Sequence, residues 1–483
     1  MRSTNDIIVA PATLTGGAIA IVRLSGEGSI ALCDKVFRAR KGTLAAAATH
    51  TLHYGEIIDG DRVVDDTLVS IFRAPHSYTG EESVEISCHG SQYIVQEIIA
   101  LLLKHGAHTA EAGEFTTRAY LAGRMDLSQA EAVADMIAST SKAQHTMAST
   151  QMRGGYSSRL SELRELLVEL AALLELELDF SEEEVEFADR SHLSSLMESL
   201  SKEIEKLAES FAVGNAIKKG VPVAIIGEPN VGKSTLLNCL LGEKRAMVSE
   251  IAGTTRDLIE EELVLDGITF RFIDTAGIHE TDDKLELMGI ERTLSAIEKA
   301  QIIIHLTDAE IGSTKESESG TKIEAEIGVK ISVKTELKNE KIDNQSISTH
   351  LNNLRKDQKI IEVINKIDIR SNLLKNDLSD KKIRISAKEQ IGIDNLRKEL
   401  RSQIDTQALY EGSPIVSNLR HHDLLNSSLE LIKTAQQGIQ TSLPTDLICQ
   451  DIREVLHNIG SITGSITTTD ILTTIFSKFC IGK

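Results

Sequence analysis

The sequence predicts a multidomain chain of α/β and α type, in which an α/β domain interrupts a helical domain and an α+β domain precedes both. Three observations support this fold class. Short strand patterns alternate with turns over residues 1–125, leucine-rich helical stripes lie on both sides of the middle of the chain, and a strand–loop–helix rhythm runs over 221–404. We therefore expect segments with the bounds 1–125, 126–217, 218–405 and 406–483.

The composition limits the classes of protein that the chain can belong to. Its 483 residues carry a formal charge of −20, from 52 basic and 72 acidic residues, so the chain by itself is a poor candidate for wrapping nucleic acid. The five cysteines lack metal-ligand spacing and are odd in number, which favours reduced thiols and a cytoplasmic location. The N-terminus lacks the pattern of a signal peptide, and no apolar run approaches the ~18 residues that span a membrane.

The N-terminal segment shows the period of strands and then of a helix. "GAIAIVRLSG" and "DTLVSIFRAP" are typical of buried strands, "SVEISCHG" alternates like a half-buried strand, and "SQYIVQEIIALLLKHG" has helical spacing with a glycine stop. These patterns predict a compact α+β domain.

Two later segments show helical stripes. Leucines recur with helical spacing in one helix, and a second helix repeats the pattern: Leu163, Leu166, Leu167, Leu170, Leu173, Leu174, then Leu193, Leu196, Met197, Leu200, Ile204, Leu207. We expect 126–217 to form one helical domain with the C-terminal segment, although two separate helical pieces would show the same stripes. The pair His421–His422 is expected on a helix surface.

A phosphate-binding loop follows the apolar strand that begins at 221. "GEPNVGKS" places Gly227, Gly232, Lys233 and Ser234 in the G-x-x-x-x-G-K-[ST] pattern, between a strand and a helix. The glycines let backbone N–H groups surround phosphate oxygens, Lys233 supplies charge to the β- and γ-phosphates, and the Ser234 hydroxyl suits Mg²⁺. The pattern predicts a nucleotide site.

Two further strand ends indicate which base is bound. "VINKID" places Asn365, Lys366 and Asp368 after one strand, and a carboxylate at 368 can accept from the N1–H and 2-amino groups of guanine, which adenine lacks. "IRISAK" places the backbone of residues 386–388 near the base oxygen. Either run alone could be a plain loop, but their order after a phosphate-binding loop predicts GTP and an inserted Ras-like P-loop GTPase domain.

The loops between these motifs are expected to sense the γ-phosphate. "LVLDGITFRFIDTAG" predicts a hairpin with an Asp–Gly turn, whose second strand leads to Asp274, a partner for Mg²⁺ through water, and to Gly277. "SEIAGTTRD" offers a threonine hydroxyl to complete the Mg²⁺ shell. We expect GTP contacts from these loops: Asn230, Val231, Gly232, Lys233, Ser234, Thr235, Ser249, Glu250, Ile251, Ala252, Gly253, Thr254, Thr255, Asp274, Thr275, Ala276, Gly277, Asn365, Lys366, Asp368, Ser386, Ala387 and Lys388.

Ile278 raises a question about hydrolysis. Ras-type enzymes have glutamine here to orient water, whereas an aliphatic side chain cannot. Either the enzyme is slow or another group positions the water.

Residues 310–358 interrupt the α/β rhythm with a polar stretch, which predicts a surface insertion or, because of "IGVKISV", an ordered hairpin.

Several motifs together resemble one family. "GEPNVGKS", "IAGTTRD", "DTAGI", "NKID", "GGAIAIVRLSG", "SYTGEESVEISCHG", "AGEFTTRAYLAGRMDLSQAEAVADMI" and the terminal "FCIGK" are similar to the MnmE family (also called TrmE) of bacterial and organellar tRNA-modification GTPases. The resemblance covers the chain except 310–358. It implies a homodimer joined through the N-terminal domains, with G domains that meet across the dimer when GTP is bound.

The resemblance implies how hydrolysis is achieved. A potassium ion would take the place of an arginine finger, with Asn230, Ser249, Ile251 and Thr254 as its ligands, although Asn230 could merely shape the loop. Ser234 and Thr255 would hold Mg²⁺. Glu286 would position the water and act with Lys233 in catalysis.

The resemblance also implies a chemistry for the N-terminal domain. It would be folate-binding-like and take a 5-formyl- or methylene-tetrahydrofolate through Arg23, Glu81, Arg124 and Lys483, although without the resemblance surface ion pairing is the favoured interpretation of the first three. With an FAD-dependent partner, MnmG, in a heterotetramer, the chain would install a carboxymethylaminomethyl or aminomethyl group at C5 of the wobble uridine of certain tRNAs.

Cys480 stands at the spacing of a prenylation box, but Gly482 is not aliphatic and Lys483 is an unsuitable last residue. On a continuous helix Cys480 would share a face with Leu472 and Phe476. A packed thiol and a thiol near a functional site both remain open.

The alternative functions are a ribosome-assembly GTPase that binds rRNA, which predicts a basic RNA module, and a membrane-tethered switch, which depends on Cys480 alone.

Overall fold

The computed structural model describes residues 6–179, 190–242, 261–273, 294–309, 358–369, 382–404, 413–441, 443–477, 479 and 482. The chain divides into two compact units. The first comprises Met1–Ala138, Ala148–Glu209 and Arg420–Lys483, and the second Ser139–Met147 and Ser210–Leu419. The domain bounds expected from the sequence stay a prediction.

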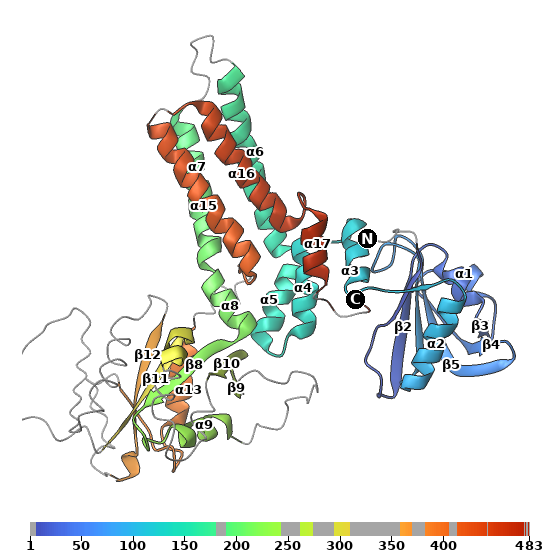
Figure 1. The fold of residues 1–483 in the computed structure, drawn as a ribbon, viewed down its shortest axis with the longest axis horizontal. Coiled ribbons are helices and arrows are strands. Elements are labelled where there is room, and N and C mark those ends of the chain that lie inside the picture. Colours follow the sequence, from blue (N-terminus) through green and yellow to red (C-terminus); the bar gives the residue numbers. More distant parts are fainter. Residues whose placement is uncertain are drawn as a thin grey trace, which may run out of the picture. The chain divides into compact units, whose positions relative to one another are not determined.

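The first unit begins with a seven-stranded sheet of order β3-β4-β5-β6-β2-β1-β7 (Figure 1). Its neighbouring strands are antiparallel except for β1 and β7, which pair in parallel. The strands are β1 Ile8–Pro11, β2 Ile19–Ser25, β3 Phe37–Ala39, β4 Thr51–Asp59, β5 Arg62–Phe72, β6 Ser83–His89 and β7 His108–Thr109. Both β2 and β6 lie where the sequence period predicts strands.

The two faces of this sheet differ in burial. Apolar side chains on one face, including Val22, Ile86 and Val69, are fully buried, and α2 (Gln92–Lys104) packs over them. Alternation along the strands places Tyr54 and Leu68 on the opposite face, where they are 46% and 40% exposed. The sheet therefore buries one face within the chain and leaves apolar side chains of β4 and β5 accessible on the other.

The rest of the first unit is helical. It comprises α1 Ser29–Asp34, α3 Glu114–Leu121, α4 Leu127–Ala138, α6 Gly155–Asp179, α7 Arg190–Glu209, α15 Leu419–Gln440, α16 Thr445–Thr463 and α17 Thr469–Phe476, while α5 Lys142–Met152 crosses the boundary between the units. The helices α6 and α16 run side by side, although they are far apart in sequence (Figure 1). Hydrogen bonds from Thr445 to Glu177 and from Arg453 to Glu175 join these two helices. The predicted discontinuous helical domain is confirmed.

The second unit is built on a six-stranded sheet of order β13-β12-β11-β8-β10-β9, in which only β9 is antiparallel to its neighbour. Its elements are α8 Phe211–Lys219, β8 Val221–Gly227, α9 Lys233–Leu241, β9 Glu261–Leu265, β10 Ile268–Phe272, β11 Ile302–Asp308, β12 Lys359–Asn365, β13 Ile383–Arg384 and α13 Ile393–Ser402. The Asp266–Gly267 turn has φ of 47° and 82°, so the predicted two-residue hairpin is confirmed.

Candidate functional site

The carboxyl ends of four parallel strands gather at one edge of the second sheet. Gly227 ends β8 and pairs with Leu306 of β11, while Asp308 at the end of β11 lies opposite Asn365 at the end of β12. Ser386 follows β13 shortly afterwards. In open α/β sheets ligands bind beyond these strand ends, and all the predicted nucleotide motifs that the structure describes lie there.

The loop after β8 adopts a conformation that depends on its glycines. Gly227 and Gly232 have φ of 154° and 101°, and the intervening Asn230 has φ of 62°. A Cβ atom at Gly227 would lie 2.3 Å from Leu306 O, and one at Gly232 would lie 2.4 Å from Asn365 Nδ2. Helix α9 begins directly after Gly232, so its N-terminus is directed at the space where a phosphate would lie.

Lys233 lies over this loop. Its Nζ donates to Gly227 O at 2.9 Å and to Glu228 O at 3.0 Å. Burial lowers the pKa of Lys233, and a phosphate beside the ammonium would restore the preference for the charged form. The side chain is thus held at the loop, and its contact with phosphate stays a prediction.

Asn365 links the phosphate-binding loop to the loop after β13. The side chain is buried, its Nδ2 donates to Val231 O at 2.8 Å, and its Oδ1 accepts from the Ala387 N–H at 3.0 Å. Both ends of the amide are therefore occupied by protein backbone. Asn365 fixes the two loops relative to each other, whereas the sequence alone suggested only that it lies beside the base.

Asp368 is arranged as an acceptor. Ser386 Oγ donates to Asp368 Oδ1 at 2.6 Å and also accepts from the Glu389 N–H at 3.2 Å. The hydrogen bond from Ser386 lowers the pKa of Asp368, with smaller contributions from Lys388 and Lys366. An ionised carboxylate at this position can accept from the N1–H and 2-amino groups of guanine, so the chemistry fits the predicted base.

Many predicted residues lie outside the described part of the chain. These are Ser249, Glu250, Ile251, Ala252, Gly253, Thr254, Thr255, Asp274, Thr275, Ala276, Gly277, Ile278, Glu286, Cys480 and Lys483, together with 310–357 of the insertion. Of the predicted metal ligands, the structure describes Ser234 in the first turn of α9 and Asn230 in the phosphate-binding loop. Their hydroxyl and amide oxygens suit Mg²⁺ and K⁺, respectively.

Arg23 lies on the accessible face of the first sheet. Its Nε donates to Glu85 Oε1 at 2.9 Å, and its guanidinium lies 5.8 Å from the ring centroids of both Tyr78 and Phe115. The surface ion pair considered from the sequence is therefore present. The aromatic surroundings nevertheless give the guanidinium a flat, apolar neighbourhood in which an organic anion could bind.

Glu81 is held close to the same end of the sheet. Its Oε2 accepts from Ser25 Oγ at 2.8 Å and from Arg118 NH1 at 3.2 Å. The stem of Arg124 lies 3.6 Å from the position of a Cβ at the adjacent Gly80. Ser25 and Arg23 belong to the same strand, so the structure gathers the three described residues of the predicted folate site at one end of β2.

The C-terminal segment reaches the same region. Gly482 O lies 3.5 Å from Arg23 NH1, and a Cβ at Gly482 would lie 2.1 Å from Pro11 O. Phe479 packs on Phe476 and Leu127. Helix α17 ends at Phe476 and Phe479 lies in a bend, so the expectation of a helix continuing to Cys480 was wrong. The N-cap of α17 is Thr468.

The structure also reveals residues that the sequence interpretation missed or misplaced. Arg118 is buried and joins Glu81 to Glu114, a pairing that the helical i, i+4 spacing of Glu114 and Arg118 could have indicated. His421, expected at a surface, is buried, and its Nε2 lies 2.7 Å from Glu131 Oε2. That expectation was wrong because the buried carboxylate belongs to α4, far away in sequence.

The described geometry defines a class of protein. A parallel sheet whose strand β8 runs through a glycine loop into α9, with Asn365 and Asp368 at the end of a neighbouring strand, is that of a P-loop GTPase. Residues 7–124 match the model described as the GTP-binding protein TrmE N-terminus, and residues 127–480 match the MnmE helical domain.

Relatives that match over nearly the whole chain belong to the same family. The tRNA modification GTPase MnmE of Flavobacterium johnsoniae is 47% identical over 481 residues, and that of Bacteroides thetaiotaomicron is 45% identical over 490 residues, each match covering 99% of both chains. The chain belongs to the MnmE family of tRNA modification GTPases and is a GTPase. The G domain of the T. maritima FeoB iron transporter is also similar, with 21% identity, 38% of this chain and 99% of that chain covered, and a TM-score of 0.23, a likeness too low to support an argument.

Proposed function

We propose that this chain hydrolyses GTP in the course of modifying tRNA, and that the modification adds a carboxymethylaminomethyl or aminomethyl group at C5 of the wobble uridine. The matches to relatives named tRNA modification GTPase cover 99% of this chain and 99% of each relative, which supports a shared activity. The observation that carries the GTP part is the pair of hydrogen bonds made by the Asn365 side chain, which donates to Val231 O and accepts from the Ala387 N–H and so joins the phosphate and base loops into one site.

The one-carbon donor would be a tetrahydrofolate derivative held at the end of β2. Arg23 and Arg124 would bind its carboxylates, Glu81 would accept from pterin N–H groups, and Lys483 would contribute from the C-terminus. The placement of Gly482 O beside Arg23 supports a terminus that reaches this site. The residues fit the ligand because the site combines guanidinium groups, a fixed carboxylate and the rings of Tyr78 and Phe115.

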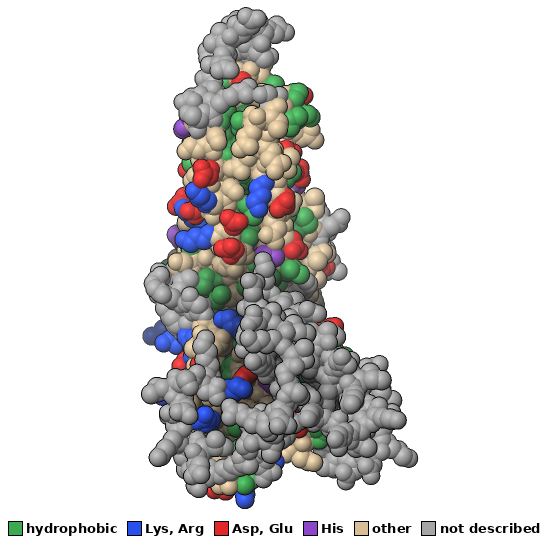
Figure 2. Space-filling model, turned by 90° about the vertical axis from the view of Figure 1, so that its left-hand side faces the viewer, with side chains coloured by type: hydrophobic (Ala, Val, Ile, Leu, Met, Phe, Trp, Pro, Cys, Tyr) green, Lys and Arg blue, Asp and Glu red, His purple; other side chains and the backbone are tan. Residues whose placement is uncertain are grey.

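A partner protein would supply the flavin and part of the contact with tRNA. An FAD-dependent protein, MnmG, would complete a heterotetramer and share the contact with tRNA. In the helical part of the face drawn in Figure 2, acidic and basic side chains are interspersed rather than gathered into one basic patch. Together with the formal charge of −20, this supports the view that the partner provides much of the grip on RNA.

The GTPase would depend on cations and on a second copy of the chain. Mg²⁺ would be held by Ser234 and Thr255, and K⁺ by Asn230, Ser249, Ile251 and Thr254, with Glu286 positioning water beside Lys233. The accessible apolar side chains of β4 and β5, among them Leu52 at 60% exposure, support a homodimer through the N-terminal domain.

We propose a cytoplasmic location, consistent with the thiol content. Among the residues that the structure describes, no helix has the length and apolar character needed to cross a membrane. The alternative of a ribosome-assembly GTPase loses its support because the regions before and around the GTP-binding unit match models of MnmE domains.

The experiment is reconstitution with the full chain, the flavoprotein partner, tRNA, GTP, methylene-tetrahydrofolate as the one-carbon source and either ammonium or glycine as the amine that supplies the nitrogen, followed by mass spectrometry of the digested nucleosides. We expect a modified uridine that depends on GTP and is lost on Lys233→Ala, which removes the phosphate contact. Arg23→Ala should abolish the modification while GTP hydrolysis continues. Unmodified uridine in the complete mixture, with GTP hydrolysis intact, would contradict the proposal.

A further inference from the structure

An ion pair joins the ends of two neighbouring strands at the nucleotide edge of the second sheet. Lys366 Nζ lies 2.7 Å from Asp308 Oδ2, and the side chains are 33% and 12% exposed. Asp308 is the last residue of β11, and Lys366 directly follows the last residue of β12. The pair is half-buried, so both side chains are held more firmly than in an exposed pair.

The backbone fixes the geometry of this pair. Asp308 and Asn365 are opposite each other in the parallel ladder, and the Ala309 N–H donates to Asn365 O at 3.1 Å. Thr307 Oγ1 donates to Val363 O at 3.2 Å one step earlier. Lys366 itself has φ of 65°, a conformation that non-glycine residues seldom adopt. The register of the two strands therefore places the Lys366 backbone beside Asp308, and the ion pair places the ammonium.

Lys366 and Asp368 belong to the same short turn. Asp368 is oriented by Ser386, as described above, and Lys366 by Asp308, so each of the two charged side chains has its own fixed partner. A free lysine has many rotamers and loses them when a ligand packs against its methylenes. A lysine whose ammonium is already bound has lost most of them beforehand.

We propose that Asp308 is a positioning residue for nucleotide binding, which holds the Lys366 ammonium so that the lysine stem is set beside the guanine base before the nucleotide arrives. The inference rests on the proposed assignment of residues 365–368 as the base site. Asp308 acts through Lys366 and contacts neither phosphate nor base. Because the base is common to GTP and GDP, Asp308 should affect both nucleotides equally.

The test measures equilibrium and stopped-flow binding of fluorescent GDP and a non-hydrolysable GTP analogue to the full chain. With Asp308→Asn we expect both affinities to fall by about five-fold and by the same factor, mainly through faster dissociation. The value of kcat at saturating GTP should stay unchanged while KM rises. Asp308→Glu, which keeps the charge, should recover part of the loss.

A matched control uses another ion pair of the same sheet. Glu362 on β12 pairs with Lys382 at 3.2 Å, and Glu362→Gln makes the same exchange of carboxylate for amide. It should leave both affinities unchanged. In a Lys366→Met background, which keeps an unbranched stem without the ammonium, Asp308→Asn should have no further effect on nucleotide affinity. A full effect in that background would overturn the proposal, because Asp308 would then act independently of Lys366.

A second variant separates this inference from the base-site assignment. Asp368→Asn places an amide donor opposite the base edge, so preference should move from guanine to xanthine nucleotides, whose 2-oxo group is an acceptor. Without that move the base site is wrong and the role of Asp308 falls with it. Suppose instead that the preference does move to xanthine nucleotides. If Asp308→Asn then binds GDP at least as tightly as wild type, or if only its affinity for GTP falls, the inference about Asp308 alone is overturned.

Discussion

Asn365 Nδ2 donates a hydrogen bond to Val231 O at 2.8 Å and so joins the end of β12 to the phosphate-binding loop. The same side chain accepts from the Ala387 N–H, which belongs to a third loop. Residues remote in sequence thus form one nucleotide site because parallel strands end at one edge of the sheet.

Asn365→Ala should separate these loops. The substitution leaves a carbonyl and an N–H without their buried partner, which costs about 2 kcal/mol in the free energy of unfolding of the second unit. Affinity for GDP and GTP should fall together, measured by calorimetric titration, and the thermal transition should shift downwards. Asp394→Ala, at an exposed position on α13, is the control and should change neither. Tight GDP binding by Asn365→Ala would show that the link is dispensable.

A buried cluster in the helical domain should be sensitive to loss of its carboxylate. Glu131 lies 3.1 Å from Arg420 NH2 and 2.7 Å from His421 Nε2. Burial alone would raise the pKa of Glu131, but His421 and Arg420 outweigh it and the pKa lies below its ordinary value. Glu131→Gln removes the buried carboxylate that faces Arg420 and His421 and should lower the free energy of unfolding by about 3 kcal/mol.

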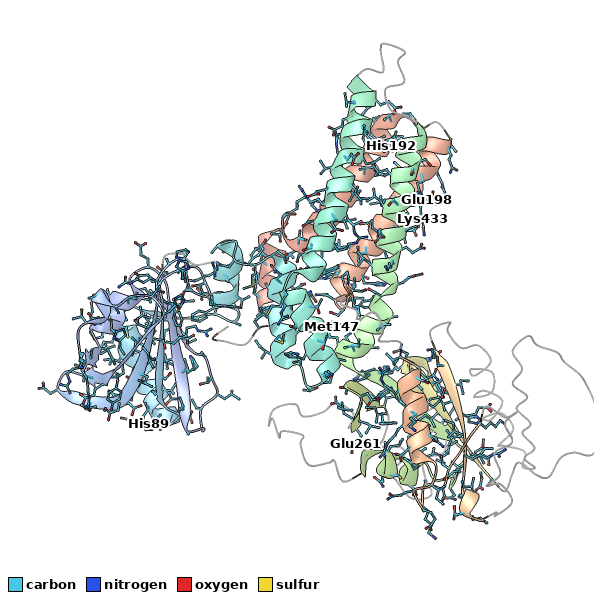
Figure 3. The ribbon with its side chains drawn as sticks, turned by 180° about the vertical axis from the view of Figure 1, so that it is seen from behind. His89, Met147, His192, Glu198, Glu261 and Lys433 are labelled. Atoms are coloured by element: carbon cyan, nitrogen blue, oxygen red, sulfur yellow. The ribbon has the colours of Figure 1, made fainter. Side chains whose placement is uncertain are left out.

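The dependence of this effect on pH follows from the sign of the shift. Since the pKa is lower in the folded state, the stabilisation is complete above the ordinary value of 4.5 and is lost as pH falls through the folded value. Urea unfolding of wild type and Glu131→Gln at pH 7 and in acid should therefore give differences that shrink in acid. Lys202→Ala removes an exposed partner of Glu198 on α7 (Figure 3) and should have no measurable effect. If Glu131→Gln also left the free energy of unfolding unchanged, the stabilising role of the cluster would be refuted.

Two thiols of the N-terminal sheet domain should resist alkylation. Burial, with a smaller contribution from Asp34, raises the pKa of Cys33 to about 12, and burial with Asp65 raises that of Cys88 to about 11. Both thiols therefore stay protonated at pH 8, where the reactive thiolate is scarce. Peptide mass spectrometry after iodoacetamide treatment should find them unmodified in the native chain and modified in urea, with the less buried Cys239 modified first. Rapid native labelling of Cys88 would contradict this.

Arg118 should prove necessary for folate binding although it was not identified from the sequence. It is buried and holds Glu81, Glu114 and the Asp6 carbonyl together. Arg118→Met should release Glu81 and lower the affinity for 5-formyl-tetrahydrofolate at least about ten-fold, corresponding to the loss of a charge-assisted hydrogen bond. Arg62→Ala breaks an exposed ion pair between Arg62 on β5 and Glu97 on α2, and should leave the affinity unchanged. Unaltered folate binding by Arg118→Met would remove the positioning role.

The sequence was most informative where a local rule determines the structure. The fold class is confirmed, and the Asp266–Gly267 turn and the strand β2 follow directly from turn chemistry and period. The P-loop motif could also be recognised locally, because its glycines adopt positive φ angles, 154° at Gly227 and 101° at Gly232.

The errors and omissions concern contacts between distant segments. Burial of His421 depends on Glu131, the role of Arg118 depends on Glu81, and that of Asp308 depends on Lys366. Phe476, the last residue of α17, lies so close to Gly113 that a Cβ atom at position 113 would be 2.6 Å from Phe476 O. No single-sequence pattern specifies which of many acids or histidines will meet across a tertiary contact.

The central claim is that GTP hydrolysis here requires a bound alkali cation and a second copy of the chain. The most direct test measures GTP turnover per molecule in potassium and in sodium over a dilution series, with Asn230→Ala alongside. The account predicts faster turnover in potassium, a rate per molecule that falls on dilution, and loss of the potassium effect in Asn230→Ala. Full turnover by a strictly monomeric preparation in buffer without either cation would contradict it.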